Sequence, residues 1–276
     1  MDYYQFSFPD LTEEQQHQLL AMLSDAGFDG FEESASGLNA FIPIEKMDEN
    51  SFNTIIELNN VSFSKSIIKE TNWNAEWERD FEPVKVFIKN ETAPFAYLRA
   101  GFHPADPTAK YDLLITPKMS FGTGHHATTF QVIELMSEID FSGKKVIDFG
   151  TGTGILSILA EKMGAAEVLA IDNDDWSIRN TEENIQANDC RRIRLLKAEA
   201  IPADENADII VANINLNVIL ANLENLRKVS GIGTIILFSG ILKEDTSIIL
   251  PGLEAAGINT DNVIEKNNWL AIQAHI

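Results

Sequence analysis

One segment of the chain combines an aspartate with three glycines at alternate positions. It reads Asp148-Phe149-Gly150-Thr151-Gly152-Thr153-Gly154 and lies between an apolar run and a predicted helix. Glycine has no Cβ, so such a segment can turn tightly and bring its backbone close to a ligand. The N-terminus of the next helix offers unpaired N–H groups and the positive end of a dipole, which suit a carboxylate or a phosphate. The segment therefore predicts a small-molecule binding loop. The alternative is a strand-to-helix turn that serves packing alone.

The spacing of the glycines separates this loop from two common nucleotide-binding motifs. A dinucleotide fingerprint has glycines at relative positions one, three and six, and the sixth position here is Ile155. A Walker loop would end in Gly-Lys-Ser or Gly-Lys-Thr, and the sequence contains neither. The pattern Asp-x-Gly-x-Gly-x-Gly instead matches the loop of methyltransferases that use S-adenosylmethionine (SAM). We therefore predict SAM as the cofactor, with Gly150 and Gly152 among the residues that bind it.

A second acidic residue indicates a bound nucleoside. Asp172 ends the apolar run 168–171 and follows Gly150 by 22 residues. A carboxylate at the end of this strand can accept hydrogen bonds from both hydroxyls of a ribose. The alternative role, capping the next helix, suits Asp174 and Asp175 better. The glycine loop and Asp172 together support the prediction of SAM.

Asn213 stands at the exit of the predicted strand 207–212. In a sheet of this type that position faces the methyl group to be transferred. Methyltransferases of adenine or glutamine amino groups carry Asn/Asp-Pro-Pro-Tyr there, whereas this chain continues with Ile214 and lacks both prolines and the aromatic residue. This disfavours those substrates. We interpret Asn213 as the candidate catalytic residue and as a cofactor contact; a turn-forming asparagine is the alternative.

A further glycine-rich segment, 121–129, precedes a predicted amphipathic helix. Its glycines permit a loop that folds closely over a ligand, and Phe121 and Thr129 lie in this segment. The adjacent His125 and His126 could suggest a metal. Neighbouring residues rarely chelate one ion, however, and no cluster of Cys, His or carboxylates accompanies them, so we predict no metal. The alternative for Thr128 and Thr129 is capping of the helix.

The charge of the chain bears on its partners. There are 21 Lys and Arg against 42 Asp and Glu, a net charge of −21, which repels phosphate backbones and favours a basic partner over nucleic acid. The basic stretch 191–194 is the one candidate RNA contact, and we interpret it as the solvated start of a strand. A single cysteine, no signal-peptide pattern and no apolar run of about 20 residues indicate a soluble cytoplasmic protein.

The elements that position these residues fall into two predicted domains. Residues 1–70 show the order strand, helix, two strands, helix, strand, which indicates a ferredoxin-like α+β domain. Its first helix should be capped by Thr12 and Gln15 and end at Gly27. Residues 71–83 are predicted as a linker helix with one aromatic face.

Residues 84–276 form the predicted catalytic domain. Three short strands, 84–88, 96–100 and 111–115, lead in. Strands and helices then alternate from about Lys144, with helices at 175–187 and 216–229 and a strand at 234–238 among them. Two closing strands, 262–265 and 269–274, are joined by a short turn. Such alternation implies a parallel sheet covered on both faces, and the final hairpin adds an antiparallel strand. The predicted fold is α/β, with a Rossmann-like, seven-stranded sheet of the class I SAM methyltransferase type.

Across these motifs the chain closely resembles the PrmA family, the SAM-dependent methyltransferases of ribosomal protein L11. The resemblance spans nearly the whole chain and includes the segments 119–129, 146–156, 170–172 and 211–214. It departs from many members at His125 and Ala127, which stand in place of Thr and Pro. The resemblance implies that four residues contact the cofactor: Thr129, Gly150, Asp172 and Asn213. Phe121, which opens the family-specific segment 121–129, is a further candidate cofactor residue.

The resemblance also implies a substrate and a role for each domain. The substrate would be ribosomal protein L11, trimethylated on lysines and on its N-terminal amine, and captured by the domain of residues 1–70. The acidic surface fits such a basic partner, and we expect a monomer with no membrane and no direct nucleic-acid contact. Two alternatives stay open: a SAM methyltransferase of another protein or a small amine, and a non-catalytic SAM-binding module for ribosome assembly.

Overall fold

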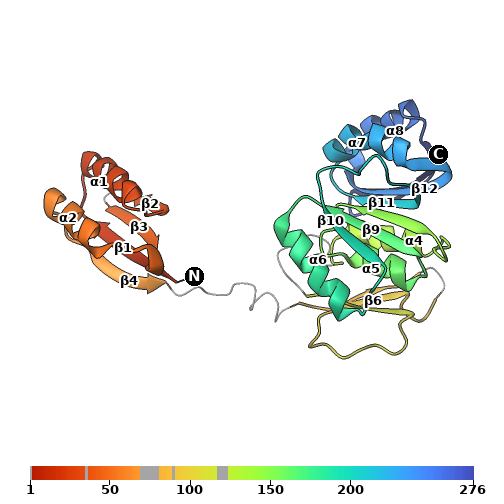
Figure 1. Cartoon of the computed structure of the whole chain (residues 1–276), viewed down its shortest axis with the longest axis horizontal. Helices are drawn as coiled ribbons and strands as arrows, with labels where there is room; N and C mark the ends of the chain where they lie inside the picture. Colours follow the sequence, from red (N-terminus) through yellow and green to blue (C-terminus); the bar gives the residue numbers. More distant parts are fainter. Residues whose placement is uncertain (1, 35–36, 69–80, 89–90, 117–123) are drawn as a thin grey trace. The chain divides into compact units, whose positions relative to one another are not determined.

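The computed structural model describes residues 2–34, 37–68, 81–88, 91–116 and 124–276. The chain forms two compact units, Met1–Trp73 and Asn74–Ile276, each built around its own apolar core (Figure 1). Most of the predicted linker helix lies outside the described residues. Residues 81–83, at its end, have no regular secondary structure.

The N-terminal unit has the order of elements predicted from its sequence. Its strands are β1 (Tyr3–Pro9), β2 (Gly30–Ser34), β3 (Gly37–Pro43) and β4 (Ser64–Ile68), and its helices are α1 (Glu13–Asp25) and α2 (Glu49–Asn59), with a 3-10 turn at Ile44–Lys46. The antiparallel sheet has the order β2-β3-β1-β4. Phe6 and Phe8 alternate along β1 and face the core with Leu19 and Leu23 of α1. The side chains on one face of β1 thus share an apolar core with the apolar face of α1.

The predicted capping box of α1 is confirmed. The Thr12 side chain accepts a hydrogen bond from the N–H of Gln15, and the Gln15 side chain accepts one from the N–H of Thr12. This satisfies two of the N–H groups that a helix start leaves open. Gly27 follows the helix with a φ of +93°, as expected for a residue that ends it.

The C-terminal unit contains the large sheet. Its strands are β5 (Val84–Val86), β6 (Ala96–Arg99), β7 (Tyr111–Leu114), β8 (Lys145–Phe149), β9 (Glu167–Asp172), β10 (Ile193–Lys197), β11 (Ala207–Asn213), β12 (Ser230–Leu242), β13 (Asn259–Lys266) and β14 (Trp269–His275). Its helices are α4 (Ala127–Met136), α5 (Ile155–Lys162), α6 (Asp175–Ala187), α7 (Leu216–Val229) and α8 (Thr246–Ala255), with a 3-10 turn at Lys243–Asp245.

Seven of these strands form one sheet in the order β10-β9-β8-β11-β12-β14-β13. The first five strands in this order run parallel, and β14 pairs antiparallel with β12 and β13. The predicted parallel sheet with a closing antiparallel hairpin is therefore confirmed. Side chains of α4 and α5 share one apolar core with one face of the sheet, and those of α7 and α8 share a second core with the other face.

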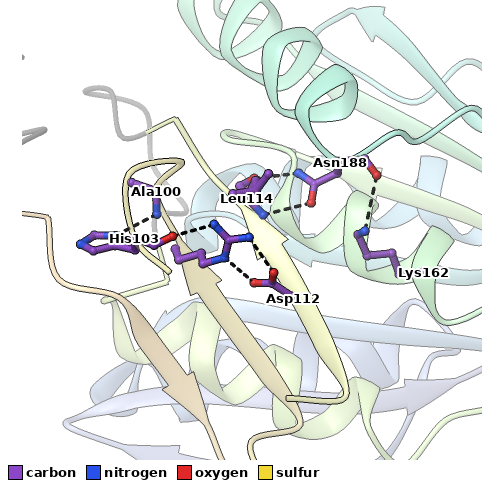
Figure 2. A network of polar contacts seen from close by, with 7 residues as sticks. Ala100, His103, Asp112, Leu114, Lys162 and Asn188 are labelled. Carbon is purple, nitrogen blue, oxygen red and sulfur yellow. Dashed lines mark hydrogen bonds and ion pairs between the residues drawn. The ribbon is translucent and has the colours of Figure 1, made fainter. Parts of the chain in front are cut away.

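A second, three-stranded sheet, β5-β6-β7, comes from the three predicted lead-in strands. Figure 2 shows the polar contacts around it: the Arg99 guanidinium makes two hydrogen bonds of 2.7 Å to the Asp112 carboxylate on the neighbouring strand. A third bond runs from Arg99 to the carbonyl oxygen of His103. Because this ion pair is bidentate and partly buried, it fixes β6 against β7.

Strand β12 is longer than predicted. The sequence indicated 234–238, whereas the strand spans Ser230–Leu242 and includes three glycines. Ser230 pairs with Ala207 of β11, regular pairing resumes at Ile235, and the register shifts again around Gly240, whose φ is +82°. The glycines therefore lie where the ladder is interrupted, and the predicted range covers the regularly paired middle of the strand. None of the helices in the described ranges has the length and apolar character needed to cross a bilayer.

Candidate functional site

The glycine loop joins β8 to α5 and requires glycine at two positions. Gly150 has a φ of +80° and Gly154 a φ of +79°. A Cβ on Gly150 would lie 2.0 Å from Cγ2 of Ile214, and a Cβ on Gly154 would lie 2.7 Å from Cγ2 of Thr181. Both positions therefore exclude any side chain, through backbone strain and through contact with neighbouring elements. Packing is thus part of the reason for these glycines, as the alternative interpretation held.

The loop is bonded to the end of β9. The N–H groups of Gly150 and Thr151 donate to the carbonyl oxygen of Ile171 at 2.8 and 2.9 Å. The N–H of Gly152 donates to Oδ2 of Asp172 at 2.9 Å. The two motifs that the sequence singled out are therefore in direct contact.

Asp172 is held by the backbone on both of its carboxylate oxygens. Its Oδ1 accepts a hydrogen bond from the N–H of Asp174 at 3.0 Å, in addition to the bond from Gly152. Asp174 itself caps α6, because its side chain accepts from the N–H of Ser177. Asp172 is therefore not the helix cap. It is a half-buried, fixed carboxylate whose oxygens each keep a second lone pair for a ligand.

Asp148, at the start of the motif, lies beneath the loop and is 1% exposed. Its Oδ2 accepts hydrogen bonds from the hydroxyls of Thr151 and Ser157 at 2.7 and 2.6 Å, so one carboxylate links the loop to α5. Its Oδ1 has no hydrogen-bond partner among the described residues. Burial in this position raises the pKa of the Asp148 carboxyl. The sequence did not predict this role, since hydroxyl residues carry no distinctive local pattern.

The N-terminus of α5 directly follows the glycine loop. Gly154 is its N-cap residue and supplies no side-chain hydrogen bond to the first turn, whereas the N–H of Ser157 in that turn bonds to the buried Asp148 carboxylate. The N–H groups of that turn have no carbonyl partner inside the helix, and they add to the positive end of its dipole. This end of α5 therefore suits a carboxylate or a phosphate.

Asn213 ends β11 and meets the first turn of α4. Its Nδ2 lies 3.4 Å from Oγ1 of Thr129 and donates to it, so two residues 84 positions apart in the sequence are brought together. Thr129 is almost fully buried, whereas Asn213 is half-buried. The helix cap is His126, whose side chain accepts from the N–H of Thr128. The alternative that the threonines cap α4 is therefore wrong.

Aromatic residues that the sequence did not point to lie beside the start of α4. The ring of Trp269 packs edge-on against that of His126, with the centroids 4.8 Å apart. The Nζ of Lys266 lies 3.2 Å from the centre of the Phe130 ring. Trp269 begins β14, and Leu242, its partner in the antiparallel pairing, ends β12. This places Trp269 at the carboxyl edge of the parallel strands, a position that no local pattern could reveal.

Parallel pairing brings the predicted residues to one edge of the sheet. Strands β9, β8 and β11 are neighbours, so Asp172, the glycine loop and Asn213 all follow carboxyl ends of adjacent strands. Ligands of open α/β sheets bind at this edge. Phe121 lies outside the described residues. Within the described ranges no three His, Cys, Asp or Glu residues are grouped as metal ligands.

The basic stretch 191–194 makes contacts within the protein. Arg192 donates to the carbonyl oxygen of Ala165 at 3.0 Å, and Arg194 forms an ion pair with Glu205. The backbone N–H groups of Arg191 and Arg192 donate to the Glu161 carboxylate. The Arg194 guanidinium and the backbone N–H groups of Arg191 and Arg192 are thus bonded to carboxylates of the protein itself. This agrees with our interpretation of the stretch as the start of a strand.

Comparison with known proteins agrees with this geometry. The model of one protein family, described as "Ribosomal protein L11 methyltransferase (PrmA)", matches residues 13–276. A protein of that name from Porphyromonas gingivalis is 38% identical over 288 residues, covering 99% of this chain and 97% of the relative. Another, from Bacteroides fragilis, is 34% identical over 285 residues and covers 99% of both chains. The crystal structure of a ribosomal protein L11 methylase from Lactobacillus delbrueckii subsp. bulgaricus is similar with a TM-score of 0.59 and 28% identity, over 65% of this chain and 93% of that one.

Proposed function

Because the chain belongs to the PrmA family of ribosomal protein L11 methyltransferases, we propose that its substrate is ribosomal protein L11, methylated on lysine side chains and on the N-terminal amine. The chain is a methyltransferase that uses SAM as its methyl donor. The observation that carries the proposal is the single edge of the sheet at which the glycine loop, Asp172 and the Asn213–Thr129 pair meet.

The residues at this edge fit the chemical groups of SAM. We propose that Asp172 accepts hydrogen bonds from the ribose hydroxyls with its remaining lone pairs. The loop at Gly150 and Gly152, with the positive end of the α5 dipole, suits the carboxylate of the methionine part. Phe121, Thr129 and Asn213 complete the proposed set of cofactor residues. When bound, SAM would supply a methyl group on a positively charged sulfur, and that sulfur is a good leaving group because it departs as a neutral thioether.

Asn213 is proposed to position the accepting amine. Its Nδ2 is engaged with Oγ1 of Thr129, which leaves its Oδ1 free to accept a hydrogen bond from a neutral amine. That bond would orient the nitrogen lone pair, and orientation of this kind supplies much of the catalysis in a displacement. A lysine must lose its proton before it reacts, and desolvation in the site lowers its pKa. We propose that water takes this proton.

The N-terminal unit is proposed to recognise the substrate. We assign residues 1–70 to substrate recognition, 71–83 to a linker and 84–276 to catalysis. The net charge of −21 favours a basic protein such as a ribosomal protein and disfavours direct nucleic-acid binding. With such a substrate we propose a cytoplasmic location, and we propose that the enzyme acts as a monomer.

The proposal is tested by incubating the purified enzyme with labelled SAM and purified ribosomal protein L11, then mapping added methyl groups by mass spectrometry. We expect mass gains of one or more methyl groups on lysines and on the N-terminus, and no transfer by Asp172→Ala. Transfer to another protein or a small amine, with none to L11, would keep the chemistry and reject the substrate. Tight SAM binding with no transfer to any acceptor would favour a non-catalytic module instead.

A further inference from the structure

Three asparagines recur every four residues along one face of α6 and its cap. Asn180 and Asn184 are 0% exposed, and Asn188, the C-cap residue, is 8% exposed. Burying a primary amide is unfavourable unless its donors and acceptors find partners. The hydrogen-bond partners of these three side chains therefore indicate why amides occupy these buried positions.

Asn188 holds the end of β7. Its Oδ1 accepts from the N–H of Leu114 at 3.0 Å, and its Nδ2 donates to the carbonyl oxygen of the same residue at 2.7 Å (Figure 2). One side-chain amide thus provides both bonds that a neighbouring strand would make. Lys162 of α5 adds a bond to the carbonyl oxygen of Asn188 at 3.4 Å. Asn188 joins structural elements but does not contact the glycine loop.

Asn184 makes the same kind of contact to two separate segments. Its Oδ1 accepts from the N–H of Thr116 at 2.7 Å, two residues beyond Leu114. Its Nδ2 donates to the carbonyl oxygen of Thr153, in the glycine loop, at 2.8 Å. The second hydrogen of that Nδ2 is directed to Oδ1 of Asn180 at 3.2 Å. The orientation of the Asn184 amide is therefore fixed by two acceptors and one donor.

These bonds set the direction of the peptide groups in the glycine loop. Thr181 of α6 donates to the carbonyl oxygen of Gly152 at 2.7 Å, next to the bond from Asn184 to Thr153. In a trans peptide the C=O and the N–H that share the bond point in opposite directions. Two successive carbonyls held toward α6 therefore turn the following N–H groups away from α6.

We propose that Asn184 is a positioning residue for the methyl donor: it holds the Thr153 carbonyl so that the glycine loop keeps its donor-binding conformation. The proposal rests on the proposed function only in taking SAM as the ligand of this loop. Asn188, one turn further along, is a matched control, because it has the same side chain and likewise bonds two backbone groups, both of them on Leu114 of β7 and neither in the glycine loop.

The test compares Asn184→Ala with Asn188→Ala in the full-length chain. Affinity for SAM and for its demethylated product is measured by calorimetry, and thermal stability by the unfolding midpoint. We expect both variants to unfold at lower temperature, because each leaves buried backbone groups unpaired. Only Asn184→Ala should also bind SAM about 10-fold more weakly, which is the effect of losing one buried hydrogen bond that the bound state needs.

Steady-state kinetics give a second, independent readout. The KM for SAM should rise in Asn184→Ala while the KM for the protein substrate stays within about twofold of the wild type. If Asn184→Ala does not fold, Asn184→Leu replaces it. The leucine fills a similar volume without burying a charge and cannot donate to the Thr153 carbonyl, so the same weakening is expected.

Equal SAM affinity in Asn184→Ala and the wild type would overturn the proposal. So would equal losses of affinity in the Asn184 and Asn188 variants, since that result would mean a general effect of stability. Donor binding is measured without any methyl acceptor. A wrong assignment of ribosomal protein L11 as substrate would therefore leave this test intact and would appear only in the transfer assay.

Discussion

Asn213 is half-buried at the end of a parallel strand, and its side chain contacts the first turn of α4. Its bond to Thr129 is long, at 3.4 Å, and satisfies only its amide nitrogen. A turn asparagine would use its side chain to bond the nearby backbone. Asn215, two residues later, does this as the N-cap of α7, through the N–H of Val218.

Asn213→Ala is expected to lower turnover at saturating SAM about 100-fold, because misplacing one reacting partner costs a factor of this size. The matched control is Asn215→Ala, which should lose about 1 kcal/mol of stability with its helix cap and keep wild-type turnover. Turnover is measured with labelled SAM under saturating conditions for both variants. Wild-type turnover in Asn213→Ala would remove this residue from the mechanism.

Asp148 gives the site a pH dependence. Burial holds the pKa of its carboxyl above the ordinary 3.8, so the folded state favours the protonated form more than the unfolded state does. The contribution of Asp148 to the free energy of unfolding is therefore greatest at low pH and falls as pH rises from about 3.8 through the raised pKa.

Asp148→Asn removes this ionisation while keeping an acceptor for Thr151 and Ser157. The free energy of unfolding of the variant, minus that of the wild type, should be larger at pH 8 than at pH 4. Urea denaturation at both pH values measures the difference. A difference that does not change with pH, or that changes in the opposite direction, would show that burial does not govern this carboxyl.

At the level of elements, caps and periodic patterns predicted most helix boundaries. The ranges predicted for α6 and α7 agree with the structure to the residue, and in the structure the side chains of Asp174 and Asn215 cap these two helices. The same local patterns could not predict His126 as the cap of α4, because histidine is an uncommon N-cap and two threonines follow it. Trp269 reaches the site through antiparallel pairing with β12, a contact between distant segments that local sequence does not encode.

The turn between β8 and α5 can be tested by adding a side chain to one of its glycines. Gly150→Ala places a Cβ 2.0 Å from Ile214 in a left-handed backbone conformation, so we expect loss of SAM binding and a stability loss of more than about 2 kcal/mol. Gly143→Ala is the control, because Gly143 also has a positive φ, +72°, but a Cβ there meets nothing within 4 Å. It should lose about 1 kcal/mol and bind SAM normally. Calorimetry and thermal unfolding decide between these outcomes, and normal SAM binding by Gly150→Ala would count against the described loop.

At the level of the whole molecule, the described residues form two apolar cores in the C-terminal unit and one in the N-terminal unit. The parallel pairing in the catalytic sheet followed from the alternation of strands and helices in the sequence, whereas the spatial order of the strands did not. Which residues of the N-terminal unit would contact a substrate could not be predicted, because its exposed surface carries no chemical motif comparable to the glycine loop.

Separate cores lead to a prediction about separate roles. Deleting residues 1–70 should abolish methylation of ribosomal protein L11 while SAM affinity stays within about threefold of the wild type. Calorimetry with SAM shows whether the remaining chain is folded, and the transfer assay measures methylation. Loss of both activities together would contradict separable roles, as would full methylation by the truncated chain.

The hydrogen bonds of the glycine loop have a consequence for how quickly and how firmly a ligand is bound. Ile171, Asp172, Thr181 and Asn184 bond the loop on two sides, and all of these contacts are made within the protein. Ordering the backbone of one residue opposes association by about 1–2 kcal/mol when it has to happen at binding. Here the backbone of the loop loses this entropy during folding, before the ligand binds. The donor therefore meets a rigid receptor, and its association should resemble a single diffusional step without a slow rearrangement.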